Sequence, residues 1–146
     1  MDEHVEWFTA DVGTWDGDME VRAQPGAEPQ RSRGVMTQRM VGTWLVSDFK
    51  NETGFEGRGI YGWDTAKQAY VGTWIDSMRG ALVVGTGTRE GQTMTYRFEL
   101  AAGERPMRWT DVTERLDANT RRFRTVIELA SGELHDVVTA TYRRRL

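Results

Sequence analysis

One carboxylate in this sequence could act as a general acid or base. Asp76, in the run GTWID, lies two residues after Trp74 and therefore on the same face of an extended strand. If Trp74 points into a closed interior, Asp76 faces apolar surroundings, where a carboxyl group can hold a proton and exchange it with a substrate. Alternatively, Asp76 ends the strand and is bound by water or backbone groups. Both interpretations stay open, and Asp76 is the best candidate for a catalytic residue.

Metal and covalent chemistry find little support in the composition. The chain has 146 residues, no cysteine and only two histidines, His4 and His135. Thiolate metal sites, disulfides and a site with three histidines are therefore excluded. The sequence also lacks the G-x-S-x-G pattern of a serine nucleophile, so covalent acyl chemistry is not indicated. We expect no metal site.

The run GRGIYG, residues 57 to 62, matches the glycine pattern of dinucleotide-binding loops. That chemistry needs a preceding strand and a following helix whose N-terminus binds the pyrophosphate. The next residues along the chain are instead WDTAKQAYVGTW, which predict a tight turn and another strand. We therefore interpret these glycines as bends of a curved sheet.

Alternating apolar and polar residues predict that strands position all of these groups. In MTYRFEL, residues 94 to 100, Met94, Tyr96 and Phe98 share one face and Arg97 and Glu99 share the other. About ten such runs succeed one another, separated by turn signals such as KNETG and DANT. Closing the sheet is the simplest way to protect its edges. The expected fold class is all-β, a closed or nearly closed antiparallel up-and-down barrel, in one domain (1–146: short helix 2–11, barrel 12–146).

The run VGTW occurs three times, beginning at Val12, Val41 and Val71. The residues after each copy do not match, and no copy occurs near position 100, so a solenoid is excluded. The copies are expected to open the first strand, to form a hairpin turn at Gly42 and to lie within a strand. We interpret them as local reuse of a residue combination in which a large indole packs next to a glycine.

The sequence resembles a bacterial lipocalin-like family of unknown function, within the calycin barrels. The resemblance runs through VGTWDGDMEVRAQPG, VGTWLVSDF, GFEGRGIYGWD, YVGTWIDSM and TATYRRR. More distant members of the superfamily are lipocalins, fatty-acid-binding proteins and the haem-binding nitrobindins. The resemblance implies that Trp15 packs at the closed end beneath an arginine and that the two side chains form a structural pair. The expected arginine is Arg143, with Arg144 as the second choice. It also implies a haem alternative, with His135 as the single iron ligand; otherwise no cofactor is expected.

The charge distribution of the chain indicates which classes of partner to expect. The net charge is −3, which argues against a nucleic-acid binder, although arginines cluster at 121–124 and 143–145. Those clusters predict either an anion-binding patch or a solvated face. We expect a cytoplasmic protein with no membrane span and a possible homodimer.

The interior of the barrel remains as the expected functional site. We predict that it binds a small hydrophobic or amphipathic molecule without covalent catalysis. The sequence leaves open whether the protein is an enzyme, although it favours a role without catalysis. The predicted ligand-binding residues are Gln38, Ser47, Tyr61, Trp63, Trp74, Met94, Tyr96, Phe98 and Trp109. Two alternatives remain: a cyclase, isomerase or lyase that uses Asp76, and a filled barrel that acts through its surface.

Overall fold

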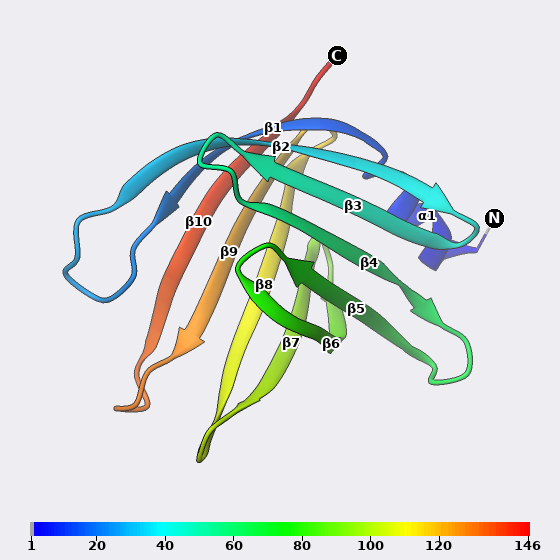
Figure 1. Cartoon of the computed structure of the whole chain (residues 1–146). Helices are drawn as coiled ribbons and strands as arrows, with labels where there is room; N and C mark the ends of the chain where they lie inside the picture. Colours follow the sequence, from blue (N-terminus) through cyan, green and yellow to red (C-terminus); the bar gives the residue numbers. More distant parts are fainter. Residues whose placement is uncertain (1) are drawn as a thin grey trace.

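Ten antiparallel strands, each joined to the next by a short turn, make up most of the structure. The computed structural model describes residues 2–146, apart from the side chain of Ala102. The elements are α1 (Glu3–Thr9), β1 (Gly13–Val21), β2 (Gln30–Val41), β3 (Trp44–Asn51), β4 (Glu56–Asp64), β5 (Ala69–Asp76), β6 (Arg79–Glu90), β7 (Thr93–Ala102), β8 (Arg105–Asp117), β9 (Thr120–Glu128) and β10 (Leu134–Arg144). Each strand pairs with its neighbours along the chain, and β1 also pairs with β10, which closes the barrel (Figure 1). The predicted fold class is confirmed.

The alternation in the sequence corresponds to the inner and outer faces of the sheet. On β7, Met94, Tyr96 and Phe98 are 4%, 7% and 3% exposed, whereas Arg97 and Glu99, at the alternate positions, are exposed. Successive side chains of a strand point to opposite faces, so this pattern places the apolar set inside the barrel.

The three VGTW runs occupy three different settings. The first enters β1, and its Trp15 is the largest fully buried side chain among the described residues. The second is the β2–β3 hairpin, where Val41 pairs with Trp44 and Gly42 adopts a φ of 59°, which favours glycine. The third lies inside β5. Local reuse is therefore the correct interpretation.

Helix α1 covers one end of the barrel. The carboxylate of Asp2 caps it by accepting a 2.7 Å hydrogen bond from the backbone N–H of His4. Trp7 and Phe8 are buried, and the helix contacts β2, β3 and β4 (Figure 1). It is shorter than the predicted helix over 2–11. In the part of the chain that the structure describes, no helix is long and apolar enough to cross a bilayer.

The glycines of GRGIYG make space for aromatic rings. The run lies within β4 and is followed by a turn and β5 in place of a helix, so the dinucleotide motif is a chance match. A Cβ atom at Gly57 would lie 2.2 Å from the indole of Trp74, and one at Gly62 would lie 2.5 Å from that of Trp44. These glycines have no positive φ, and the role that the structure shows for them is close packing against aromatic rings. That they bend the sheet stays a prediction.

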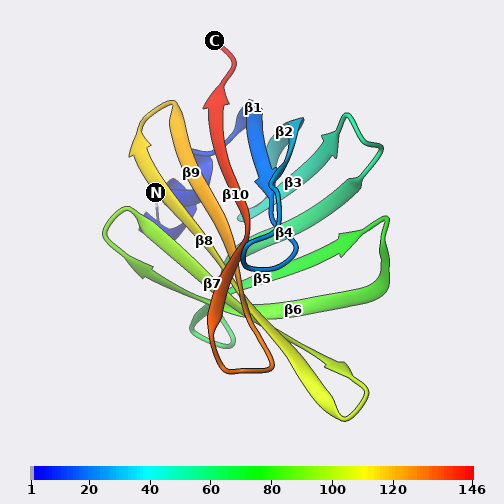
Figure 2. The same cartoon turned by 90° about the vertical axis from the view of Figure 1, so that its left-hand side faces the viewer.

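The pairing between β6 and β7 covers only part of the two strands. Paired positions run from Thr86 with Arg97 to Glu90 with Thr93, all near the helix end of the barrel. Toward the other end the two strands separate, and the β7–β8 hairpin projects away from its neighbours (Figure 2). This separation widens the barrel at the end opposite α1.

Candidate functional site

The barrel encloses a cavity of about 550 Å³. Trp7 and Phe8 of α1 are buried and close one end, whereas Met78 and Met107 in the wall are 81% and 44% exposed. The cavity therefore opens at the end away from the helix, and we call that opening, bounded by Asp76, Met78 and Met107, the mouth. The apolar side chains of the wall include Met19, Met36, Leu45, Phe49, Phe55, Trp74, Met94, Trp109, Phe123, Ile127 and Val138.

Seven of the nine residues predicted to bind a ligand line this cavity. They are Gln38, Ser47, Tyr61, Trp74, Met94, Tyr96 and Trp109. Of the other two, Trp63 stacks on His4 with ring centres 3.9 Å apart, and Phe98 stacks on Trp109 at 5.5 Å. Neither is among the described residues of the wall. Gln38 also has a structural task, because its side-chain amide donates a 2.9 Å hydrogen bond to the carbonyl oxygen of Asp11.

Asp111, a carboxyl group that the sequence analysis did not single out, lies in the middle of the wall. It is at the centre of β8, paired across the ladders with Tyr96 on β7 and Thr125 on β9. The hydroxyl group of Thr125 donates a 2.8 Å hydrogen bond to Oδ1 of Asp111. Burial raises the pKa of the Asp111 carboxyl to about 6, although the Thr125 bond and the charge of Arg79 act in the opposite direction. Asp111 is half-buried and lines the cavity.

Three phenol groups share the cavity with Asp111. The rings of Tyr61 and Tyr96 have their centres 5.2 Å apart, and Tyr142 lines the wall from β10. The Tyr96 hydroxyl is buried and has no hydrogen-bonding partner among the described residues. Burial raises the pKa of all three phenols, and the charge of Asp111 raises those of Tyr61 and Tyr142 further. All three are therefore neutral at physiological pH and can donate a hydrogen bond.

Asp76 lies at the mouth, at the end of β5. One carboxylate oxygen accepts a 2.9 Å hydrogen bond from the indole N–H of Trp74, and the other accepts one of 2.9 Å from the backbone N–H of Met78. The sequence left open whether Asp76 faces a dry interior or ends a strand, and the second placement is the one observed. Asp76 orients the Trp74 indole at the mouth.

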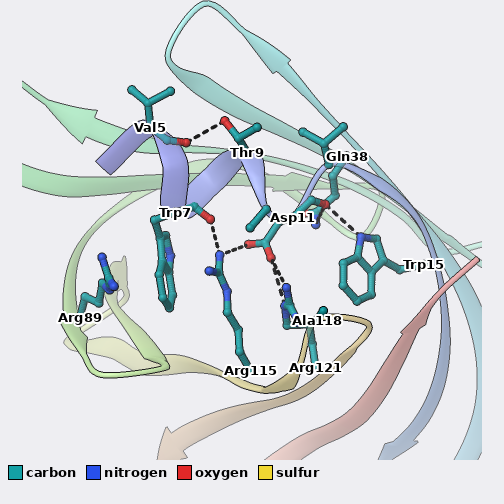
Figure 3. A network of polar contacts seen from close by, with 12 residues as sticks. Val5, Trp7, Thr9, Asp11, Trp15, Gln38, Arg89, Arg115, Ala118 and Arg121 are labelled. Carbon is teal, nitrogen blue, oxygen red and sulfur yellow. Dashed lines mark hydrogen bonds and ion pairs between the residues drawn. The ribbon is translucent and has the colours of Figure 1, made fainter. Parts of the chain in front are cut away.

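An ion-pair network holds α1 over the closed end (Figure 3). The carboxylate of Asp11 forms 3.0 Å ion pairs with both Arg115 and Arg121. Arg115 also donates a hydrogen bond to the carbonyl oxygen of Trp7. The Trp7 indole lies between two guanidinium groups, with those of Arg115 and Arg89 3.3 and 4.0 Å from its ring centre. The positive charges of Arg115 and Arg121 are thus committed to Asp11.

Arg144, and not the expected Arg143, lies over Trp15. The guanidinium group of Arg144 is 4.3 Å from the Trp15 ring centre, and that of Arg121 is 4.7 Å away. The β1–β10 register pairs Trp15 directly with Arg144. Arg143 therefore points outward, where it lies 3.7 Å from Asp18. The expectation for Arg143 is wrong by one residue.

The two arginine clusters are divided between the inside and the outside of the barrel. Arg121 and Arg144 cover Trp15 from within. The outward arginines pair with acidic residues on adjacent strands: Arg122 with Glu114 at 3.6 Å, Arg124 with Asp136 at 3.5 Å and Arg145 with Asp16 at 2.7 Å. Such exposed pairs contribute about 0–1 kcal/mol each. The outer part of the clusters is a solvated, charge-balanced face.

His135 is a poor candidate for a haem ligand. Its Nε2 lies 2.6 Å from the carbonyl oxygen of Arg22 and is committed to that hydrogen bond. In the described part of the chain, His135 is absent from the cavity wall, and no group of three His, Cys, Asp or Glu side chains could hold a metal ion. The donor set therefore does not fit haem bound through His135.

Comparisons with known proteins place the chain in a family. Residues 1–144 match the family described as protein of unknown function, DUF1579, so the chain belongs to it. No curated protein matches the sequence. The structure is similar to that of Rv2717c from M. tuberculosis, with a TM-score of 0.67 and 12% identity, over 100% of this chain and 99% of that one. It is also similar to the S-type phycobiliprotein lyase CPES from Guillardia theta, with a TM-score of 0.60 and 11% identity, over 97% and 92%. At these identities the likeness shows the barrel fold alone, and the similarity to lipocalins, fatty-acid-binding proteins and nitrobindins stays a prediction.

Proposed function

We propose that this DUF1579 protein binds a small apolar or amphipathic molecule inside its barrel. The observation that carries the proposal is the cavity of about 550 Å³, which lies within the range of roughly 300–1,000 Å³ typical of ligand pockets. Its wall combines aromatic and methionine side chains with a small number of polar groups, as such pockets do. Because side chains leave this space open, the alternative of a filled barrel is not supported.

Apolar contact supplies the affinity in this proposal. Trp74, Met94 and Trp109 present flat or flexible apolar surfaces to the cavity, and each 100 Å² of apolar surface removed from water stabilises a complex by about 2.5 kcal/mol. Part of that gain offsets the lost freedom of the ligand. Methionine side chains adapt to ligands of different shape, so the cavity should accept a class of related molecules and not one molecule alone.

A variant that adds an aromatic ring to the cavity tests the proposal directly. Thr113 lines the cavity from β8, whereas Thr110, three residues earlier on the same strand, points outward. Thr113→Phe narrows the cavity and should weaken binding of decanol, an uncharged amphiphile, measured by isothermal titration calorimetry. Thr110→Phe adds the same ring outside and should leave binding unchanged. Equal decanol binding by wild type and Thr113→Phe, with both folded by circular dichroism, would show that the molecule does not enter the barrel.

Asp111 also supports an alternative function, that of an enzyme. Asp76 is held by hydrogen bonds at the mouth, so a cyclase, isomerase or lyase would use Asp111 as its acid or base instead. A carboxyl group whose pKa is about 6 can both give and take a proton near neutral pH. Chromatography of a ligand recovered from the protein, before and after incubation with fresh protein, separates the two functions. Conversion that Asp111→Asn abolishes supports an enzyme, and unchanged recovery supports a binding protein.

A further inference from the structure

Two of the three carboxyl groups that line the cavity among the described residues are already engaged. Asp11 pairs with two arginines at the closed end, and Asp76 accepts hydrogen bonds from Trp74 and from a backbone N–H at the mouth. Asp111, between the two ends, accepts a single hydrogen bond, from Thr125 to Oδ1. In the described part of the chain its Oδ2 has no hydrogen-bonding partner, and the residue lines the cavity.

The protein supplies no close counter-charge to Asp111. Among the described residues, no Lys, Arg or His nitrogen lies within 4.0 Å of its carboxylate. The charge of Arg79 lowers the pKa of Asp111, but its guanidinium group stacks on another residue, 4.9 Å from the ring centre of Trp109. Because the pKa of Asp111 is about 6, most molecules carry a negative charge here at neutral pH. A carboxylate held away from water without a cation is unfavourable unless something else neutralises it.

The aromatic groups that share the cavity with Asp111 suit a cation. Tyr61 on β4, Tyr96 on β7 and Tyr142 on β10 present neutral phenols, and Phe123 on β9 packs against Tyr142 with ring centres 6.5 Å apart. Aromatic faces attract ammonium groups, most strongly where water is excluded. Neutral phenols can also accept hydrogen bonds from an amine without opposing its charge.

Resting on the proposed function, we infer that the cavity selects a ligand that carries a protonated amine, bound by the Asp111 carboxylate near the hydroxyl groups of Tyr61 and Tyr142. The apolar body of the ligand then extends toward the mouth along Trp74 and Trp109. A neutral hydrogen-bond donor would satisfy one oxygen of Asp111 but would leave its charge unbalanced. An amine satisfies both requirements.

An anionic head group, the opposite ligand chemistry, could pair with the arginines at the closed end or with Arg79, which lines the cavity and lies over the Trp109 ring. Arg121 donates hydrogen bonds to Asp11 and to the carbonyl oxygens of Asp117 and Thr120, so its three nitrogens are engaged. Arg115 is paired with Asp11. At the closed end an anion would have to displace Asp11 from these partners, and beside Arg79 it would be repelled by the Asp111 carboxylate.

Three probes of equal chain length, decylamine, decanol and decanoate, separate these possibilities. Each is titrated at pH 7.5 into wild type, Asp111→Asn and the control Asp76→Asn, which removes the carboxylate at the mouth. Isothermal titration calorimetry gives affinity and stoichiometry. Wild type should bind decylamine about 10- to 100-fold more tightly than decanol. Asp111→Asn should remove this preference while retaining decanol binding, and Asp76→Asn should keep it.

The inference is overturned if wild type binds decylamine and decanol equally, or if decanoate binds most tightly. It is also overturned if the amine preference survives in Asp111→Asn, because the amine would then be binding elsewhere on this acidic chain. Decanol binding at one molecule per chain in each of these cases would leave the proposed function intact. If none of the three probes binds, both the proposed function and this inference fail.

Discussion

Replacing Asp111 with asparagine should stabilise the ligand-free protein at neutral pH. Burial raises the pKa of this carboxyl from 3.8 in the unfolded chain to about 6 in the folded one. The folded state therefore prefers the neutral form, and the group costs stability once it is ionised. Asparagine has nearly the same shape, carries no charge, and its carbonyl oxygen can still accept the hydrogen bond from Thr125.

The size of the effect can be worked out from the difference in pKa. About two units correspond to about 3 kcal/mol, because one unit is about 1.4 kcal/mol. Water that enters through the mouth reduces this figure, so we expect about 1–3 kcal/mol at pH 8. The cost is absent below the unfolded pKa of 3.8, grows as the pH rises and is complete above the folded pKa of about 6. The advantage of Asp111→Asn should therefore increase by about 1 kcal/mol between pH 5 and pH 8.

Urea unfolding of wild type and Asp111→Asn at a series of pH values between these two limits measures the difference. For a domain of this size, each kcal/mol at pH 8 also raises the melting temperature by roughly 2–4 °C. The matched control is Asp76→Asn, which removes a carboxylate that forms two hydrogen bonds at the mouth and should not stabilise the protein. If Asp111→Asn destabilises the protein by the same amount at every pH, then the Asp111 carboxylate is stabilising and the account of the cavity is incorrect.

Three further substitutions separate binding from stability. Trp74→Ala removes an indole from the mouth and should weaken decanol binding by about 10-fold or more in calorimetry; unchanged affinity would place the ligand elsewhere. Trp15→Ala removes a fully buried indole and should lower the free energy of unfolding by about 3–5 kcal/mol in urea, with little effect on binding. Equal effects of both tryptophan variants on stability, and none on binding, would mean that the pocket is misplaced. Asp11→Asn leaves Arg115 and Arg121 without a counter-charge and should cost about 3 kcal/mol in the same urea assay; a neutral result would show that the ion pairs do not hold α1.

The barrel itself could be predicted because its determinants are local. Alternation along β7 and the turn at Gly42 each reflect the geometry of one strand or one hairpin. Closure was expected from the need to protect strand edges. The existence of a cavity could not be decided in this way, because inward side chains such as Tyr61 and Tyr96 can either fill a barrel or line an open space.

Two features of the site that the sequence analysis missed, Asp111 and Arg144, follow from the two-residue alternation of a strand. Asp111 lies two residues after Trp109, a predicted wall residue, and therefore on the same face of β8. Arg144 lies two residues after Tyr142 in the same way, which makes it the inward arginine and Arg143 the outward one. Trp63 obeys the inward pattern as well, but its place near α1 puts it against His4, and strand periodicity does not contain that long-range contact.

Native mass spectrometry of freshly purified protein, with the same measurement repeated after denaturation, tests the central claim that the barrel holds a small molecule. We predict a reproducible additional mass in the native spectrum, an organic amine by the further inference, that is lost on denaturation and reduced in Thr113→Phe. A native spectrum that contains only the bare chain, even after incubation with excess decylamine or decanol, would contradict the account.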